Sequence, residues 1–380
     1  MSKQNPPVKP KVTPIYQTSV FTFDDLTELE AYFEQPSQRY MYARYSNPNA
    51  NELAEEVNKL EQGDGAVVTS SGMSAIFTAI LLFCQTGDHV LCAEEIYGGS
   101  AVLLNQELSR MGISVSYVPV ENLYDLTSVV KPNTRLLLAE TMSNPLLRVL
   151  DIGRLAITCR EQNIKLVIDN TFASPVITRP LTLGADAVIH SVTKYLAGHS
   201  DVTAGIVVTK GEDQVKRARQ IMMHYGLNLS PFESWLAVRG LKTLRLRIKQ
   251  HSSNALAIAE YLSKHPKVDR VYYPGLATHP DHELAKSQGN GLFGGMLSFA
   301  IADSEALVNI FMRSLPTIPF APSLAGVSTS ISHPVRTSHR SLNPEKRDAL
   351  GITMGVIRLS VGVEEPEEIL AELEEALNAI

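Results

Sequence analysis

The stretch 166-LVIDNTFASPVITRPLTLGADAVIHSVTKYLAGHSDVTAGIVV-208 decides the fold, and Lys194 lies in its second half. Residues 166–168 and 187–189 are short apolar runs, which are typical of buried parallel strands. Asp169 follows the first run, and the polar segment 190–194 follows the second. Ligands of open α/β sheets bind at the carboxyl ends of the strands. We therefore expect the functional site at this edge of the sheet.

Lys194 is the first candidate for chemistry. A lone lysine is usually a solvated surface charge, and an aspartate after a strand is often only a helix cap. Here the lysine follows an apolar strand and two hydroxyl residues, and the small, polar turn 198–201 comes after it. A glycine in such a turn permits close approach of a ligand. A lysine in this context is readily desolvated and can bond covalently to a carbonyl ligand.

The block 168-IDNTFASPVITRPLTLGADAVIHSVTKYLAGHSD-201 closely resembles the Cys/Met-metabolism family of pyridoxal 5′-phosphate (PLP) enzymes, and the similarity extends from about Thr13 to the C-terminus. The resemblance implies that Lys194 bonds PLP covalently and that Asp169 pairs with its pyridinium nitrogen. It also implies that Ser191 and Thr193 bind the phosphate. A carboxylate beside the ring nitrogen keeps that nitrogen protonated, which makes the cofactor a better electron sink.

Composition limits the possible partners. The chain has 380 residues, of which 44% are hydrophobic and 19% are charged, enough for a large core and two domains. A net charge of −6 argues against nucleic acid or an anionic membrane as the main partner. The sequence shows neither a secretory signal nor an apolar run near the roughly 18 residues of a membrane span, so we expect the cytoplasm. The three cysteines are widely spaced, which indicates reduced structural residues and no metal site.

Residues 1–48 are expected to form an arm, because proline-rich and polar pieces leave no core of their own and only a short helix at 24–33. Tyrosines and arginines cluster at 39–48, a composition that fits interface packing as well as function. The resemblance implies that Tyr42 and Arg44 reach into the neighbouring subunit's site and contact the phosphate there.

Strands predicted at 66–69, 89–93, 113–118 and 135–140 alternate with helical stretches, which favours a mainly parallel sheet. Ser70-Ser71-Gly72-Met73 joins the first strand to an apolar helix at 74–83, and it fits either simple capping or a phosphate site. It lacks the lysine of a P-loop. The resemblance implies that Gly72 and Met73 hold the phosphate.

Two loops at the same predicted edge contribute further candidates. Tyr97 follows the strand 89–93, and on its own a tyrosine beside two glycines more often packs than reacts. The resemblance implies that its ring stacks on the pyridine ring, and its hydroxyl can assist the leaving group. Asn144 is a weaker candidate for the border of the ring.

The C-terminal part supplies the expected substrate contacts. Arg358 lies in the apolar strand 356–361, where it needs either an ion-pair partner or a ligand. The resemblance implies that Arg358 grips the substrate α-carboxylate, with Ser323 and Leu324 nearby. By the resemblance, cystathionine γ-lyases usually carry a glutamate just before this Ser-Leu pair and methionine γ-lyases a small apolar residue, whereas this chain has Pro322. The absence of the carboxylate favours methionine or homocysteine as substrate.

Two basic or glycine-rich patterns have simpler interpretations. Ser230 starts a helix that carries several basic residues, and we expect this helix to face solvent or a subunit. The segment 289–294 matches a dinucleotide fingerprint, but a helix precedes it and a strand follows it, the wrong order for such a site. Arg336 and Arg340 remain unexplained charges.

The expected fold is the aspartate-aminotransferase-like fold (fold type I) of PLP-dependent transferases: an arm (1–48), a large PLP-binding α/β domain (49–240) and a smaller α+β C-terminal domain (241–380). The expected assembly is a homotetramer of two dimers with shared sites. The expected activity is γ-elimination from methionine, homocysteine or cystathionine, giving 2-oxobutyrate, ammonia and a thiol. The alternatives are a γ-replacement transferase (cystathionine γ-synthase or O-acetylhomoserine sulfhydrylase), a cystathionine β-lyase, a dinucleotide oxidoreductase and a silent binding protein.

Overall fold

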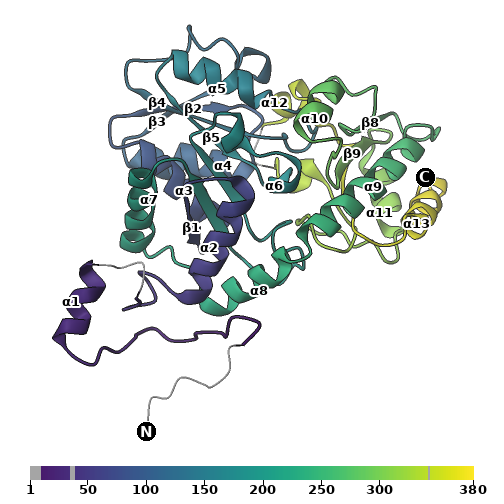
Figure 1. The fold of residues 1–380 in the computed structure, drawn as a ribbon. Coiled ribbons are helices and arrows are strands. Elements are labelled where there is room, and N and C mark those ends of the chain that lie inside the picture. Colours follow the sequence, from purple (N-terminus) through teal and green to yellow (C-terminus); the bar gives the residue numbers. More distant parts are fainter. Residues whose placement is uncertain (1–9, 35–38, 341–342) are drawn as a thin grey trace.

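The computed structural model describes residues 10–34, 39–340 and 343–380. Residues 1–9 and 35–38 of the predicted arm lie outside this part of the chain. Figure 1 shows two sheets surrounded by helices, the larger at the upper left and the smaller at the right. No helix in the described ranges is long and apolar enough to cross a bilayer.

The larger sheet is mainly parallel, as predicted. Its strands are β1 (Gly65–Thr69), β2 (His89–Ala93), β3 (Ser114–Val118), β4 (Thr134–Glu140), β5 (Lys165–Asp169), β6 (Ala187–Ser191) and β7 (Gly205–Thr209). They lie in the order β1-β7-β6-β5-β4-β2-β3. Strands β2 to β6 pair in parallel, whereas β7 is antiparallel to both β1 and β6. The carboxyl ends of β4, β5 and β6 therefore meet at one edge.

Helices cover both faces of this sheet. On one face, Val167 packs in the cluster beneath α3 (Gly72–Phe83), and on the other, Leu166 and Ile168 pack in the cluster beneath α5 (Ile152–Glu161). All three side chains are fully buried, and each contributes about 1.5–3 kcal/mol of hydrophobic stabilisation. Because helices pack on both faces of the sheet, a ligand can reach the strands only at their ends.

The smaller sheet is antiparallel. Its strands are β8 (Arg270–Tyr272), β9 (Met296–Ala300), β10 (Ser330–Ser332) and β11 (Val356–Ser360), in the order β10-β11-β9-β8. Arg358 lies at the centre of β11, opposite Ser298 of β9 and Ser332 of β10. The remaining longer helices are α1 (Leu26–Glu34), α2 (Pro48–Glu61), α7 (Glu212–Tyr225), α8 (Pro231–Leu241), α9 (Leu244–Leu262), α10 (His282–Gln288), α11 (Glu305–Arg313) and α13 (Pro366–Asn378); the shorter ones are α4 (Gly98–Val102), α6 (Ser174–Ile177) and α12 (Pro344–Ala349).

The described part of the arm stands outside the two sheets. Figure 1 shows α1 at the lower left, apart from the sheets. Trp235 Nε1 donates a hydrogen bond to the carbonyl of Thr13 at 3.0 Å, which ties the start of the arm to α8. Leu26 of α1 is 79% exposed and Phe33 is 58% exposed, so the described part of the chain leaves this apolar surface uncovered.

The basic helix predicted after Ser230 is in fact two helices. The predicted start is confirmed, because Ser230 Oγ accepts from Glu233 N and donates to Glu233 Oε2. However, α8 ends at Leu241 and α9 begins at Leu244. Arg247 of α9 is buried, although we expected it to face solvent or a subunit. The glycine-rich segment 289–294 lies between α10 and β9, the order of elements that the sequence predicts.

Candidate active site

The ends of β4, β5 and β6 place a row of polar groups at one edge. Asp169 is the last residue of β5, in register with Glu140 at the end of β4, and Ser191 ends β6. Thr171 links the strands, because its Oγ1 donates to Asp169 Oδ1 and accepts from Ser191 N at 2.9 Å. Burial raises the pKa of Asp169, while the hydrogen bonds from Thr171 lower it.

The start of α3 lies against this edge. Ser71 is the N-cap, and its Oγ accepts from Ser74 N at 3.1 Å. A Cβ on Gly72 would lie 2.8 Å from Ser191 Cβ, so only glycine allows the helix to approach β6 this closely. The helix begins at Gly72, two residues before the predicted 74, and its first N–H groups have no intrahelical partner. The N–H groups of Gly72 and Met73 thus offer an anion site beside the Ser191 hydroxyl.

Lys194 lies in the turn after β6. Its backbone N donates to Ser191 O at 3.1 Å, and its Nζ lies 3.4 Å from Ser323 Oγ, which comes from the C-terminal part of the chain. Burial, and then the charge of Arg358, lower the pKa of Lys194. The lowered pKa increases the neutral fraction of the amine, as a nucleophile or base requires.

Arg247 supports the turn that carries Lys194. Its guanidinium donates to the carbonyls of Tyr195 at 2.7 Å, Leu196 at 3.3 Å and Gly240 at 2.9 Å. Gly198 has a φ of 78°, and a Cβ there would lie 2.2 Å from Arg247 Nη1. The arginine therefore caps carbonyls that would otherwise be buried without donors, a role that the sequence analysis missed.

Arg358 points into the same region from β11. Its Nη1 donates to Asn144 Oδ1 at 2.9 Å and its Nη2 donates to Ser323 O at 3.4 Å. Its buried Nε has no hydrogen-bond partner within the described chain. Burial lowers the pKa of Arg358 to about 10, so the group remains a cation at neutral pH. An unpartnered N–H on a buried cation is a ready binding point for a carboxylate.

Tyr97 is held by its backbone. Its N–H donates to Glu140 Oε1 at 2.8 Å, while its side chain is 44% exposed. The ring lies at the start of α4, and a Cβ on Gly99 would come within 2.5 Å of it. The backbone contact fixes the turn and leaves the ring facing the cavity.

A cavity of about 630 Å³ brings most of the predicted residues together. Its walls include all the predicted residues Gly72, Met73, Tyr97, Asp169, Ser191, Thr193, Lys194, Leu324 and Arg358, together with Asn144 and Pro322. Ser323 contributes through its contacts with Lys194 and Arg358. Glu140, Met142 and Thr171 also line the cavity and were not predicted from the sequence. Arg336 and Arg340, which the sequence pattern left unexplained, line it too.

Tyr42 and Arg44 do not line this cavity in their own chain. Arg44 Nη1 donates to Met223 O at 3.0 Å, and its guanidinium lies 5.5 Å from the ring centroid of Tyr42 and 4.7 Å from that of Tyr45. The arm residues therefore form their own cluster beside α7.

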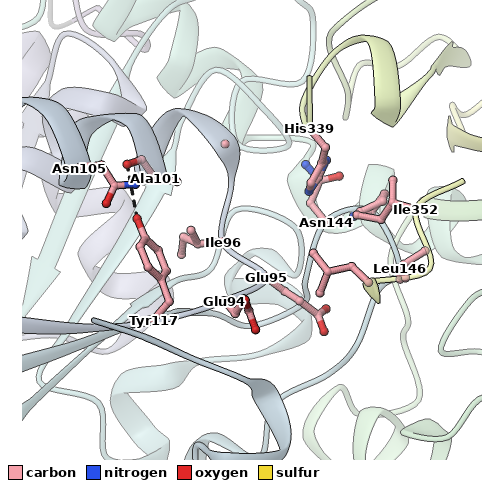
Figure 2. A pocket seen from close by; sticks show the side chains of 13 residues that line it. Glu94, Glu95, Ile96, Ala101, Asn105, Tyr117, Asn144, Leu146, His339 and Ile352 are labelled. Carbon is pink, nitrogen blue, oxygen red and sulfur yellow. Dashed lines mark hydrogen bonds between the residues drawn. The ribbon is translucent and has the colours of Figure 1, made fainter. Parts of the chain in front are cut away.

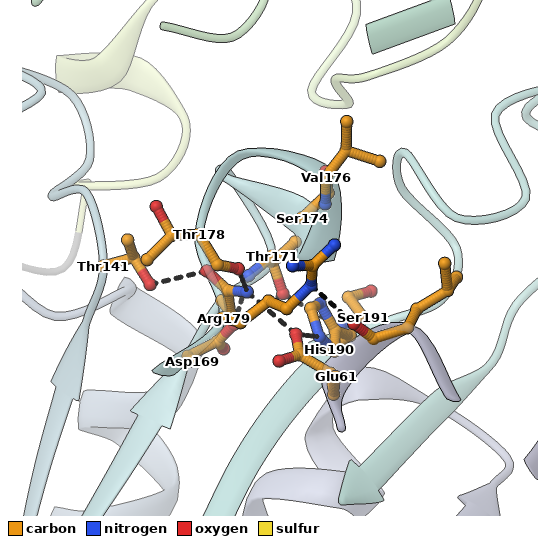
Figure 3. Close-up of polar contacts among 12 residues, drawn as sticks. Glu61, Thr141, Asp169, Thr171, Ser174, Val176, Thr178, Arg179, His190 and Ser191 are labelled. Carbon is orange, nitrogen blue, oxygen red and sulfur yellow. Dashed lines mark hydrogen bonds and ion pairs between the residues drawn. The ribbon is translucent and has the colours of Figure 1, made fainter. Parts of the chain in front are cut away.

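A buried polar network supports Asp169 and its neighbours from below (Figure 3). Glu61 Oε1 accepts from Asn170 Nδ2 at 2.9 Å and lies 2.7 Å from His190 Nε2. Thr141 Oγ1 donates to Asn170 Oδ1 at 2.7 Å. Glu61, His190 and Asn170 are at most 1% exposed. The network locks the ends of β5 and β6 to α2, so the edge is rigid.

A smaller cavity of about 80 Å³ adjoins the site (Figure 2). Tyr117 and Asn105 lie at one end and His339 and Asn144 at the other, and Asn144 lines both cavities. Burial, and then Arg358, lower the pKa of His339 to about 4, so its imidazole is neutral. This volume suits a few water molecules rather than an amino acid. We therefore interpret the smaller cavity as part of the surroundings that hold Asn144 in place, and not as a second substrate site.

The chain is similar to known proteins over nearly its whole length. A family model described as "Cys/Met metabolism PLP-dependent enzyme" matches residues 1–378. An L-methionine gamma-lyase of Fusobacterium nucleatum subsp. polymorphum is 41% identical over 97% of this chain and 93% of its own length. A cystathionine beta-lyase of Lactococcus lactis subsp. cremoris is 42% identical over 96% and 93%. A crystal structure of cystathionine gamma synthase from Xanthomonas oryzae pv. oryzae in complex with cystathionine superposes with a TM-score of 0.91 at 38% identity, covering 97% of this chain and 93% of that one.

Proposed function

The chain belongs to the Cys/Met metabolism family of PLP-dependent enzymes, with the fold type I architecture predicted for it, and on this premise we propose that it cleaves the γ-carbon–sulfur bond of a sulfur-containing amino acid. The products are 2-oxobutyrate, ammonia and a thiol, and one water molecule is consumed. One observation carries the proposal: the Lys194 amine, the Asp169 carboxylate and the Arg358 guanidinium line a single cavity.

The residues of the cavity fit the cofactor. The free N–H groups of Gly72 and Met73 and the Ser191 hydroxyl suit the phosphate. Thr193 Oγ1 accepts from Ala204 N at 2.9 Å, so its proton can turn from Ala204 O to the phosphate without loss of that bond. Asp169 suits the pyridine nitrogen and Lys194 the aldehyde carbon. The bound cofactor supplies an electron sink for the negative charge that forms at the substrate Cα.

Lys194 and Arg358 then divide the work on the substrate. The Arg358 guanidinium binds the α-carboxylate through its free Nε, while Asn144 holds its Nη1 in place. This fixes the Cα–H bond toward the cavity. The Lys194 amine, with its pKa lowered by burial, removes the Cα proton and, after passing it on, a Cβ proton, so that the electron pair of the Cβ–H bond expels the γ-sulfur. It then returns a proton to the carbon chain of the substrate. The Tyr97 hydroxyl protonates the departing sulfur.

Pro322, Arg336 and Arg340 of the cavity wall are proposed to surround the distal end of the substrate. Pro322 lines the cavity and provides neither a charge nor an N–H donor. Arg336 and Arg340 line the cavity too, and Arg336 Nη2 contacts Glu305 at 2.7 Å. Guanidinium groups at this position favour a γ-substituent that ends in a carboxylate, as in cystathionine, over methionine or homocysteine. The structure therefore shifts our substrate preference away from the one that Pro322 alone suggests.

The same residues also serve γ-replacement and β-elimination, and relatives of near-equal identity carry both γ-lyase and β-lyase names. For the assembly, we propose a homotetramer of two dimers in the cytoplasm, in which Tyr42 and Arg44 complete the phosphate site of the neighbouring subunit. We further propose the division into an arm (1–48), a PLP-binding domain (49–240) and a C-terminal domain (241–380).

Product analysis tests the reaction. The enzyme is incubated with cystathionine, methionine, homocysteine, cysteine, or O-acetylhomoserine plus a thiol, and keto acids and thiols are quantified. We expect 2-oxobutyrate and cysteine from cystathionine. Pyruvate and homocysteine would identify a β-lyase instead, and a new thioether from O-acetylhomoserine would identify a transferase. The Lys194→Ala variant should lose turnover and retain loosely bound cofactor; full activity in this variant would refute the assignment of Lys194.

A further inference from the structure

Two carboxylates lie side by side at the base of the cavity. Glu140 and Asp169 end neighbouring parallel strands in register, and both line the cavity. Their hydrogen bonds come from neutral donors: Thr171 N and Oγ1 donate to Asp169, and Tyr97 N donates to Glu140 Oε1. Nothing in the proposed reaction uses Glu140, so its presence beside the carboxylate proposed for the ring nitrogen requires its own explanation.

Electrostatics favours one proton on this pair. Burial raises the pKa of Glu140 well above its usual value, and the neighbouring charge of Asp169 raises it further. Burial also raises the pKa of Asp169, but two hydrogen bonds from Thr171 and the charge of His190 oppose that rise. Two like charges in a desolvated site cannot both form without a large cost, so the carboxylate with more stabilising hydrogen bonds and a nearby positive charge ionises first. Asp169 has more opposing donors and is that carboxylate.

The other groups around Glu140 support this assignment. The titratable or charged groups around Glu140 are Cys92, Glu95, Tyr97, Lys194 and Arg358. Cys92 lies on β2, Glu95 and Tyr97 lie in the loop after β2, and Lys194 and Arg358 lie across the cavity. Glu95 adds negative charge and raises the pKa of Glu140 again, and burial keeps Cys92 a neutral thiol. Lys194 and Arg358 face the cavity and are not among the causes that shift the pKa of Glu140.

We propose that Glu140 is a positioning residue that keeps its proton while Asp169 is ionised, so that the base of the cavity carries one negative charge and a neutral carbonyl oxygen. The ionised Asp169 faces the ring nitrogen, and the oxygen of the neutral Glu140 holds the Tyr97 N–H, which fixes the stacking turn. This inference rests on the proposed function, because Asp169 is assigned to the ring nitrogen there.

Two substitutions of Glu140 test whether PLP binding depends on its hydrogen-bond acceptor or on a negative charge. A glutamine side chain is neutral and keeps an oxygen acceptor for Tyr97 N, so Glu140→Gln should mimic the proposed state. Glu140→Leu removes the acceptor and leaves the Tyr97 N–H without its partner. The dissociation constant of PLP, measured by equilibrium dialysis with absorbance detection, should rise about tenfold or more in Glu140→Leu relative to Glu140→Gln. Equal losses of PLP affinity in both variants would overturn the proposal, because the negative charge rather than the acceptor would then matter.

Infrared difference spectroscopy tests the proton directly. In the wild-type holoenzyme at neutral pH, a protonated carboxyl group has a carbonyl stretch that lies above the carboxylate bands and shifts in D₂O. We expect the wild-type minus Glu140→Gln spectrum to contain this band. A difference spectrum with carboxylate bands alone would overturn the proposal even if Glu140→Leu failed to fold.

The control separates this inference from the proposed function. Asp169→Asn should weaken PLP binding, and burial, the largest cause of the raised pKa of Glu140, should keep its carboxyl band in place. If Asp169→Asn retained full PLP affinity and turnover while the band was present, the assignment of Asp169 to the ring nitrogen would fail and the protonation of Glu140 would stand.

Discussion

Lys194 and Arg358 bring two basic groups to one buried cavity. The Arg358 charge is a cause of the lowered pKa of Lys194, second to burial. Such a pair is costly in the empty site, and the cost is offset when a carboxylate binds the guanidinium. Substrate binding and the state of the lysine are therefore linked through a single charge.

The first prediction concerns the shape of the Arg358 head group. In Arg358→Lys, one ammonium replaces a planar fork that contacts Asn144, Ser323 and the substrate at once. We expect kcat/KM to fall about tenfold to a hundredfold, with a smaller change in kcat. Arg270→Lys, an exposed arginine on β8 of the same sheet, is the matched control. Steady-state kinetics check both variants. An unchanged kcat/KM in Arg358→Lys would contradict the proposal that Arg358 binds the substrate carboxylate.

The second prediction concerns the distal end of the substrate. Replacement of Arg336 or Arg340 by Gln should lower the cystathionine-to-methionine ratio of kcat/KM by about threefold to tenfold for each change, because a guanidinium–carboxylate contact is lost. Pro322→Glu should raise the same ratio about tenfold, because a carboxylate there can bind the distal ammonium of cystathionine. If all three variants keep the wild-type ratio, the rim of the cavity does not select the substrate.

At the scale of elements, α9 shows how a strand-end site depends on a helix from elsewhere in the chain. Arg247 lies on the buried side of α9 with Leu244, Ile248 and His251, a helical spacing that faces the interior. Its neighbours of the same charge, Arg245 and Lys249, are exposed, and the charge pattern alone does not distinguish Arg247 from them. Its place within an apolar stripe was the signal that could have separated it from Arg245 and Lys249.

The third prediction follows from that helix. Arg247→Met should lower the free energy of unfolding by about 3 kcal/mol, because the carbonyls of Tyr195, Leu196 and Gly240 lose buried donors. Arg245→Met, on the exposed face of α9, should change it by about 0.5 kcal/mol or less. Urea unfolding of the two variants gives the comparison. Similar losses in both would mean that Arg247 contributes no more than a surface charge.

The strands that carry the site were predictable, because their apolar runs and the polar residues after them follow simple rules. Asp169 and Lys194 were found in this way, and the resemblance supplied the roles. The antiparallel β7 was not predicted, because a fully buried apolar run such as 205–209 carries no sign of its direction. The break between α8 and α9 was missed because the residues at 242–243 include no glycine or proline. The pairing of Glu140 with Asp169 depends on strand register, which the sequence does not show.

At the scale of the whole molecule, the cavity lacks the two arm residues that were predicted for it. Arg44 contacts its own chain at Met223, and the exposed Leu26 and Phe33 of α1 have no cover within the described chain. The exposed apolar surface of α1 fits an arm that packs against a second copy. The proposed dimer then has two sites, each built from two chains.

The fourth prediction tests this sharing. Arg44→Ala and Lys194→Ala proteins are each inactive or weakly active, but a mixed dimer contains one site with both wild-type residues. After dissociation and random reassembly of equal amounts, about one quarter of the wild-type sites should return, since half of the dimers are mixed. Activity and cofactor content of the mixture measure this fraction. Verified mixed dimers without any recovery would show that the arm serves its own subunit.

The order of the site residues along the chain has a consequence for biosynthesis. The groups that one chain is proposed to contribute to its own cofactor site lie between Gly72 and Lys194, whereas Ser323 and Arg358 come from the last sixth of the chain. During translation the N-terminal part folds first, so a chain can form its own share of the cofactor site while the strand that carries Arg358 is still inside the ribosome. A nascent chain at that stage can take up its cofactor before it is able to hold a substrate.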